Sequence, residues 1–249
     1  MPIHRKRIQK NPQPSHFHMG VTFPMRINKY LALKKLSTRR EADEMIQKER
    51  VLINGRLAVL GDKVEKRDEV EIMGDRKKYR YFAYYKPRGI ITHSPQRDEE
   101  SIGDIVPLEK VFPVGRLDKD SYGLIILTDD GRVTDALLNH KYEHEKEYEV
   151  TCLDKLPKDF KEKMESGVNI GDYVTKPCQV EILEKKKFSI ILTEGKNHQI
   201  RRMCGVFGQS ALELKRTRIM NIELSRLRPG EFRPIQKIEL TKFLTSIGL

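Results

Sequence analysis

Apolar side chains first recur at helical spacing in residues 27–36, which predicts a short helix there. Thr38 followed three residues later by Glu41 has the form of a capping box, in which each side chain accepts a backbone N–H at the start of a helix. The helical spacing then resumes and continues through Ile46. The pattern therefore predicts two consecutive short helices.

Short strands are expected after these helices. The apolar runs at 51–53 and 57–59 flank Asn54-Gly55, a dipeptide typical of a type I′ hairpin turn. Residues 64–72 supply a further strand. Residues 25–72 are thus predicted to form a small module of helices and strands.

The segments on either side of this module lack periodicity. Residues 1–24 mix Pro, His, Gln and basic residues, so we interpret them as a disordered basic arm. Residues 73–79 have the composition of a charged linker. No apolar run approaches the roughly 20 residues that cross a bilayer, and the first residues hold no apolar segment typical of a secretory signal. We expect no membrane association.

From residue 80 onward the pattern changes to strands with interspersed short helices, which predicts one larger domain over residues 80–249. Because the strands outnumber the helices and do not alternate strictly with them, the pattern favours the α+β class over a doubly wound fold. Strands are predicted at 81–85, 90–92, 124–127, 145–152, 188–192 and over 211–240, and helices at 133–139, 156–164 and 199–207.

The charge of the chain is concentrated in two blocks. The 249 residues have a net charge of +12, of which +7 falls in residues 1–72 and +6 in residues 195–233, while residues 73–194 have −2. A single basic stretch is usually a solvated surface. Two acid-poor blocks in one chain favour a polyanionic partner, above all a nucleic acid.

Arg39 and Arg40 fall in the first turn of the helix that follows Thr38. Cations are unfavourable at this end of a helix, because its exposed N–H groups attract anions. A phosphate would compensate, since both the helix N-terminus and the guanidinium groups bind it. The alternative is that both side chains simply point into water.

Cysteine usage indicates a reducing compartment. Cys152, Cys178 and Cys204 lie far apart, form no CxxC pair and have no metal-ligand spacing. We therefore expect neither a disulfide framework nor a metal site, and a cytoplasmic location.

The densest chemical signal is a polar segment bounded by two glycines, Gly115-Arg-Leu-Asp-Lys-Asp-Ser-Tyr-Gly123, directly before a buried strand. Such a loop presents side chains at the edge of a sheet, where sites commonly lie. Taken alone, an aspartate here is more often a turn former than a catalyst. Asp118 and Asp120 together also fit a metal-dependent nuclease or a glycosidase.

Six segments, in this order along the chain, carry a resemblance to a known family. They are Lys86-Pro-Arg-Gly-Ile90, Val114-Gly-Arg-Leu-Asp-Lys-Asp-Ser-Tyr-Gly-Leu124, Thr128-Asp-Asp-Gly131, His144-Glu-Lys-Glu-Tyr-Glu-Val150, Glu194-Gly-Lys-Asn-His-Gln-Ile-Arg-Arg-Met203 and Lys215-Arg-Thr-Arg-Ile219. With these segments the chain resembles the ribosomal pseudouridine synthases of the RsuA/RluB/RluE/RluF family, closest to the RluF branch, and its first module resembles the S-four-like RNA-binding module of these enzymes.

The resemblance implies roles residue by residue. Asp118 falls on the essential aspartate of the family, and Arg116 on the arginine that fills the gap left by a flipped-out uridine. Tyr148 falls on the tyrosine that stacks on the base. Arg201 falls on the basic residue that pairs with the aspartate, so we expect it to orient Asp118 and lower its pKa. Taken alone, Tyr148 fits a core aromatic and Arg201 a surface charge.

Other residues near these motifs are weaker candidates. We interpret Lys86, Arg88 and Arg202 as RNA contacts, with loop or helix-surface charges as the alternative. His198 fits a structural hydrogen-bonding residue better than a metal ligand or general base. Asp129-Asp130 fits a turn before a helix.

The resemblance implies an isomerase that converts one uridine of large-subunit ribosomal RNA to pseudouridine. Some members of the family also modify a uridine of a tRNA. The reaction needs no metal and no cofactor, only an ionised carboxylate in a largely dry pocket. The carboxylate acts as nucleophile at the sugar or as base at the 2′-carbon of the sugar. The domain would be built on a mixed, mainly antiparallel sheet, and we expect a monomer. The competing hypothesis is a non-catalytic RNA-binding protein in which residues 25–72 bind the RNA.

Overall fold

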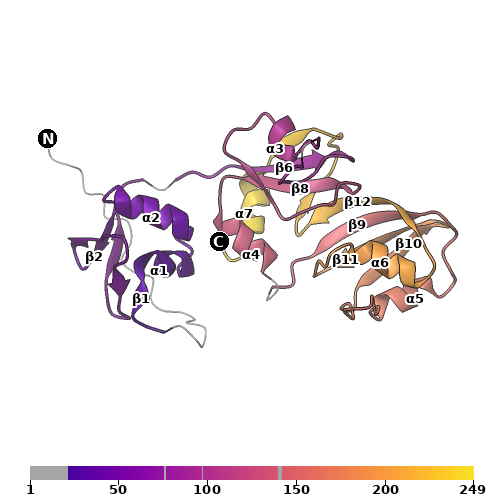
Figure 1. Ribbon diagram of the computed structural model, residues 1–249, viewed down its shortest axis with the longest axis horizontal. Helices are drawn as coiled ribbons and strands as arrows, with labels where there is room; N and C mark the ends of the chain where they lie inside the picture. Colours follow the sequence, from indigo (N-terminus) through magenta and orange to yellow (C-terminus); the bar gives the residue numbers. More distant parts are fainter. Residues whose placement is uncertain (1–21, 76, 97, 140–141) are drawn as a thin grey trace. The chain divides into compact units, whose positions relative to one another are not determined.

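The computed structural model describes residues 22–75, 77–96, 98–139 and 142–249. The chain divides between Lys78 and Tyr79 into two compact units, each with its own core (Figure 1). The first 21 residues of the predicted disordered arm lie outside the described residues. No helix in the described part of the chain is long and apolar enough to cross a membrane.

The first unit packs two helices against short strands. Strands β1 and β4 form one antiparallel pair, and β3, β2 and β5 form a three-stranded sheet in that order. Both helices bury their apolar faces in a core shared with the strands, as Leu31, Ala42 and Val51 are fully buried in it. The elements are β1 (Met25–Arg26), α1 (Ile27–Leu33), α2 (Arg39–Gln47), β2 (Val51–Ile53), β3 (Arg56–Leu57), β4 (Lys63–Val64) and β5 (Val70–Ile72).

Two local predictions for this unit are confirmed. The backbone N–H of Glu41 donates to Thr38 Oγ1 at 3.1 Å, and the N–H of Thr38 donates to Glu41 Oε2 at 3.0 Å, which is the capping box. Asn54 and Gly55 have φ angles of 50° and 79°, as the type I′ turn between β2 and β3 requires.

The second unit is built on a nine-stranded sheet. Seven strands follow the order β10-β11-β9-β12-β8-β6-β14, while β13 pairs with β12 and β7 with β8. Every pairing is antiparallel except that of β12 with β8, so the sheet is mixed and mainly antiparallel, as predicted. The strands are β6 (Tyr81–Lys86), β7 (Phe112–Val114), β8 (Tyr122–Thr128), β9 (Lys146–Cys152), β10 (Gln179–Glu184), β11 (Lys187–Leu192), β12 (Ala211–Ile219), β13 (Ile222–Glu223) and β14 (Phe232–Pro234).

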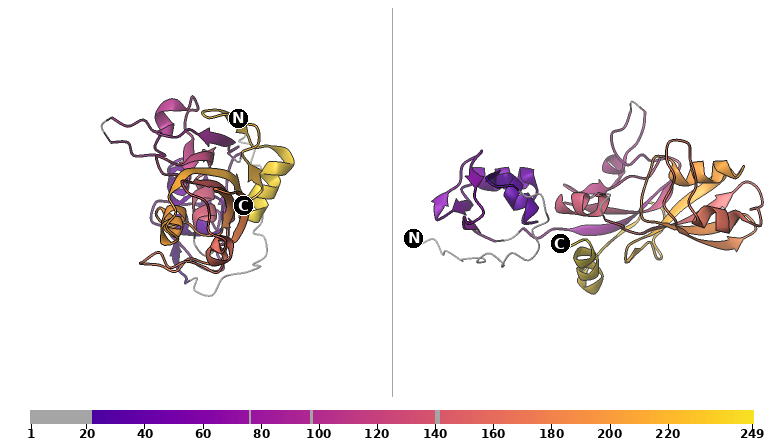
Figure 2. Two further views of the ribbon diagram at one scale, coloured as in Figure 1. Left: turned by 90° about the vertical axis from the view of Figure 1, so that its right-hand side faces the viewer. Right: turned by 90° about the horizontal axis from the view of Figure 1, so that it is seen from below.

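Short helices cover the sheet (Figures 1 and 2). Helices α5 and α6 pack on β9 and β11, where Phe160 and Met203 are fully buried. Helices α4 and α7 pack against β6 and β8 in a second core, which contains Val133 and Phe243. The helices are α3 (Ile102–Ile105), α4 (Arg132–Leu138), α5 (Phe160–Glu165), α6 (Gln199–Val206) and α7 (Lys237–Ser246).

The sheet divides along β8. One edge of β8 pairs with β6 over its whole length, while its other edge pairs first with β12, at Tyr122 and Gly123, and then with β7, from Ile126 to Thr128. Strands β7 and β12 therefore part from one another beside β8. A depression opens here, and its lining includes residues from the end of β7 and from β12.

The prediction of strands through residue 240 is wrong at its end. Residues 237–246 form helix α7. Leu240, Phe243, Leu244 and Ile247 recur at helical spacing, and the last turns of the helix bury Phe243 in the core of α4 and β6. Helical periodicity was thus present in the sequence.

Gly123 is the point at which β8 and β12 approach most closely. Its φ is +105°, and a Cβ there would lie 2.3 Å from the backbone oxygen of Arg216. We expect Gly123→Ala to lower the free energy of unfolding by about 3 kcal/mol, because backbone strain and the displacement of β12 add together. Gly89→Ala is the matched control, since its φ is +87° with nothing within 4 Å. Urea unfolding of both variants checks this, and equal losses would contradict it.

Candidate active site

The predicted aspartate lies in the loop between β7 and β8. Gly115, with a φ of 79°, turns the chain out of β7, and Leu117 is buried beside it. The buried Thr92 hydroxyl donates to Leu117 O at 2.8 Å and accepts from Leu117 N at 3.1 Å, which clamps the residue next to Asp118. The Asp118 side chain, 34% exposed, is thereby held at the edge of the depression.

Lys86, at the end of β6, supports the loop between β7 and β8 through hydrogen bonds to its backbone. Its side chain is fully buried, and Nζ donates to four backbone carbonyl groups. The acceptors are Pro87 O at 3.0 Å, Asp118 O at 3.2 Å, Lys119 O at 3.4 Å and Ser121 O at 2.7 Å. Burial lowers the pKa of Lys86 to about 8, while the charge of Asp118 acts in the opposite direction. The prediction that Lys86 contacts RNA is wrong, because the loop carbonyls surround its ammonium group.

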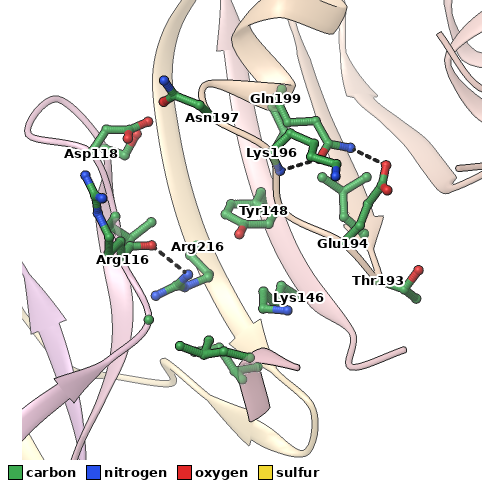
Figure 3. Close-up of a pocket in the computed structure, with 18 of the residues that line it drawn as sticks. Arg116, Asp118, Lys146, Tyr148, Thr193, Glu194, Lys196, Asn197, Gln199 and Arg216 are labelled. Carbon is green, nitrogen blue, oxygen red and sulfur yellow. Dashed lines mark hydrogen bonds between the residues drawn. The ribbon is translucent and has the colours of Figure 1, made fainter. Parts of the chain in front are cut away.

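The depression is a cavity of about 590 Å³ (Figure 3). Arg116 and Asp118 lie on one wall, and Lys146 and Tyr148 lie on another wall formed by β9. Tyr148 of β9 lies opposite Arg216 of the neighbouring strand β12, and both residues line the cavity. The cavity therefore combines a carboxylate, an aromatic ring and several cations.

Arg216 is a cavity residue that the sequence reasoning did not single out. It is 3% exposed, and its Nε donates to Leu124 O at 2.7 Å, while Nη1 reaches Arg116 O at 3.4 Å. Its Nη2 is buried and has no hydrogen-bond partner among the described residues. A buried guanidinium N–H without a partner favours a bound acceptor oxygen. The sequence signal was an arginine at an inward position of β12, two residues after the buried Leu214.

The predicted ion pair between Arg201 and Asp118 is not formed. In the described structure Arg201 does not line the cavity, and its Nη1 donates to Ala211 O at the start of β12. The residue beside Asp118 is His198, whose Nδ1 lies 3.4 Å from Asp118 Oδ2. The physical reason is that α6 packs against β12, so the Arg201 side chain meets a β12 carbonyl rather than the loop after β7.

His198 comes from a second ordered turn, before α6. It precedes the helix in a left-handed conformation, with a φ of 49°. The turn is held by Glu194, which accepts from Tyr173 Oη at 2.7 Å, Lys176 N at 3.0 Å and Gln199 Nε2 at 2.8 Å. His198 was expected to be structural, and its position opposite Asp118 was not foreseen.

Lys146 and Arg216 are two positively charged residues of the cavity that lie close enough to affect one another. Burial, together with the nearby charge of Arg216, lowers the pKa of Lys146 to about 8. The Nζ of Lys146 donates to His144 O at 3.1 Å. A lysine with this pKa exchanges its proton much closer to neutral pH than a surface lysine does.

The remaining predicted RNA contacts differ in their surroundings. Arg39, Arg40 and Arg88 are exposed, and their side chains form no hydrogen bond or ion pair with the described residues. Arg202 donates to Ile170 O and to the Asp172 carboxylate. All four stay predictions as RNA contacts.

The paired-carboxylate hypothesis has little support. Asp120 is exposed and does not line the cavity, in contrast to Asp118. Among the residues that the structure describes, no three His, Cys, Asp or Glu side chains gather where they could hold a metal ion. Asp130 instead forms a turn, as predicted: it accepts from Arg132 N at 3.1 Å at the start of α4.

Comparisons with known proteins match both units. The model of the family described as RNA pseudouridylate synthase matches residues 80–205, and that of the S4 domain matches residues 25–70. The dual-specificity RNA pseudouridine synthase RluF of Escherichia coli (strain K12) is 41% identical over 223 residues, which cover 87% of this chain and 77% of that protein. The ribosomal large subunit pseudouridine synthase B of Bacillus subtilis (strain 168) is 33% identical, with coverage of 87% and 94%.

A solved structure agrees. The crystal structure of a pseudouridylate synthase superposes with a TM-score of 0.64 at 27% identity and covers 90% of this chain and 99% of that one. Fold and site together define an RNA-modifying isomerase with an S4 domain ahead of its catalytic domain. The chain belongs to the RNA pseudouridine synthase family, as its motifs predicted.

Replacing Lys86 tests whether its ammonium group holds the loop. We expect Lys86→Met to lower the free energy of unfolding by about 3 kcal/mol and to abolish pseudouridine formation, because buried carbonyls lose their donor and Asp118 loses its support. Thermal unfolding and an activity assay measure both effects.

Lys119→Met is the matched control. Lys119 belongs to the same loop, but its side chain is half exposed and pairs with Glu99 at 2.9 Å. A surface pair of this kind contributes less than about 1 kcal/mol. Equal behaviour of the two variants would refute the supporting role of Lys86.

Proposed function

We propose that this chain converts a uridine of large-subunit ribosomal RNA to pseudouridine, with Asp118 as the catalytic carboxylate. The observation that carries the proposal is the position of Asp118 at the edge of a cavity that also holds Tyr148 and the buried Arg216. A carboxylate there can reach the sugar of a nucleotide whose base enters the cavity.

The chemistry fits these residues. The isomerisation breaks the bond from C1′ to N1, turns the base and joins C5 to C1′, with no net oxidation. An ionised Asp118 attacks C1′ or removes the proton of the 2′-carbon, and both routes need the charged form. His198 Nδ1 lies 3.4 Å from the carboxylate, and Lys86 Nζ holds the loop through its hydrogen bond to Asp118 O.

The nucleotide has to leave its stack first. Extruding it costs a few kcal/mol, which stacking and hydrogen bonds inside the cavity offset. Tyr148 is suited to stack on the base, and the free Nη2 of Arg216 is suited to donate to a uracil carbonyl. Arg116, which is exposed beside Asp118, would fill the gap left in the RNA.

Arg201 keeps a supporting part in this proposal. Its hydrogen bond to Ala211 ties α6 to β12, and α6 follows directly on the turn that carries His198. We therefore assign Arg201 to positioning of this wall. We assign the contact with Asp118 to His198 and the support of its loop to Lys86.

The RNA class is inferred from relatives and charge. One relative is named a ribosomal large subunit pseudouridine synthase, which supports ribosomal RNA. The name of the Escherichia coli relative includes dual specificity, which favours a second substrate, and we propose a tRNA. We further propose a monomer in the cytoplasm, where the three free cysteines would stay reduced. Mapping pseudouridines in both RNA classes with and without the gene tests the substrate assignment.

Asp118→Asn tests the catalytic assignment. We expect complete loss of pseudouridine formation with RNA binding nearly intact, because the amide keeps the shape but cannot act as nucleophile or base. Asp120→Asn is the matched control, since it removes an exposed carboxylate of the same loop outside the cavity, and it should keep its activity. An active Asp118→Asn variant refutes the assignment.

The same assay separates the other hypotheses. A nuclease or glycosidase would cut the RNA or release a base, and a metal-dependent one would stop when a chelator is added. A non-catalytic RNA-binding protein would bind RNA and leave it unchanged. Pseudouridine formed in intact RNA excludes both the nuclease or glycosidase hypothesis and the non-catalytic hypothesis.

Arg39 and Arg40 test RNA binding by the S4 unit. Both are exposed in the first turn of α2, beside its capping box. Changing both to Ala should weaken RNA binding and reduce the slope of log K against log salt by up to about 2, one for each lost phosphate contact.

A control pair lies on α5. Lys161 pairs with Glu165 of the same helix, and Lys163 pairs with Asp159, the residue directly before the helix. Changing both to Ala removes the same charge and should leave the slope unchanged. If the arginine pair also leaves the salt slope unaltered, these side chains do not contact phosphate.

A further inference from the structure

Lys146 and Tyr148 share one face of β9 in the cavity (Figure 3). They are two positions apart on a strand, so both side chains point to the same side of the sheet. The Nζ of Lys146 donates one hydrogen bond, to His144 O, and makes no ion pair with the described residues. Lys146 thus presents an amine to the space where a base stacked on Tyr148 would lie.

The proposed reaction requires one proton to move within the base. Uridine has a hydrogen on C5 and the sugar on N1, whereas pseudouridine has the sugar on C5 and a hydrogen on N1. Once the bond from C1′ to C5 has formed, C5 holds both the sugar and its hydrogen. At this stage C6 and N1 are joined by a double bond. When the hydrogen leaves C5 as a proton, its electron pair forms the C5–C6 double bond, the π electrons of the C6–N1 double bond move to N1, and N1 takes up a proton.

Several cavity groups are poorly suited to accept this proton. Asp118 is engaged at the sugar, and His198 lies beside it at the edge. Glu194 already accepts three hydrogen bonds that hold the turn before α6. The guanidinium of Arg216 has only hydrogen-bond donors and no acceptor atom for a proton.

We propose that Lys146 is a further catalytic residue of this reaction: its neutral amine takes the proton from C5, and the ammonium group so formed returns a proton to N1. The inference rests on the proposed function. The transfer consumes and releases nothing, because one proton leaves the base and one returns. The lowered pKa of Lys146 supports the assignment, since a usable fraction of the amine is neutral near physiological pH.

Single-turnover kinetics on RNA with protium or deuterium at C5 of the target uridine test this role. We expect Lys146→Met to slow product formation by about 10²-fold or more, with RNA affinity unchanged. Its remaining reaction should be slower with deuterium than with protium, by a larger factor than in the unaltered chain, and added methylamine should restore part of the rate.

Lys146→Arg separates proton transfer from charge. A guanidinium keeps the positive charge but cannot accept a proton at neutral pH. We expect this variant to be as slow as Lys146→Met, whereas a residue needed only for its charge would tolerate the change. If Lys146→Met does not fold, as judged by thermal unfolding, Lys146→Arg decides the test alone.

Three results overturn the inference. The first is that Lys146→Arg is active. The second is that the Lys146 variants are slow but show neither a deuterium effect nor rescue by methylamine. The third is that a deuterium effect appears in Tyr148→Phe but not in the Lys146 variants. In each of them the unaltered chain still forms pseudouridine, so the proposed function stands. If the unaltered chain forms none in any RNA, the proposed function fails and this inference fails with it.

Discussion

The buried ammonium group of Lys86 is the interaction on which the site depends. A charge without solvent has to be surrounded by acceptors, and the only acceptors within reach of its Nζ in the described structure are backbone carbonyls of its own neighbour and of the loop between β7 and β8. This requirement fixes the path of the loop past Asp118. Thr92 fixes the other side of the same loop through both polar groups of Leu117. A flexible glycine-bounded segment thereby becomes a rigid support for one carboxylate.

The division of the sheet along β8 supplies the space in front of that carboxylate. Since β12 and β7 share one edge of β8 in turn, the sheet opens between them, and side chains that would otherwise pack in a core line a cavity instead. Arg216 belongs to this boundary. Its guanidinium binds carbonyls on β8 and in the loop, and its buried Nη2 has no hydrogen-bond partner among the described residues. The same residue supports the structure and, in the proposed function, contacts the substrate.

The cations of the site are distributed by burial. Lys86 is fully enclosed and acts on backbone, whereas Arg116 stays exposed at the edge. Lys146 lies between these extremes, partly buried and facing the cavity. These positively charged residues thus differ in how much water each one keeps. Lys86 holds a loop, whereas in the proposed function Arg116 contacts the RNA and Lys146 exchanges a proton.

Much of the local structure was predictable from the sequence. The capping box at Thr38, the Asn54-Gly55 turn and most strands are set by neighbours within a few residues, and such signals are visible in a linear pattern. The motif around Asp118 likewise marked the loop that holds the carboxylate. Helix α7 was missed although its spacing was helical, because the strand pattern before it was extended too far.

Tertiary structure alone decided which side chains meet. Arg201 was expected beside Asp118, yet the packing of α6 on β12 directs it to Ala211 and brings His198 to the carboxylate instead. Lys86 was expected to face RNA and is enclosed, while Arg216 was passed over and lines the cavity. The sequence by itself determined most of the elements, the family and the loop that carries Asp118, because these depend on local spacing and motif identity. Partner choice depends on how distant strands and helices pack, and a linear pattern does not contain those distances.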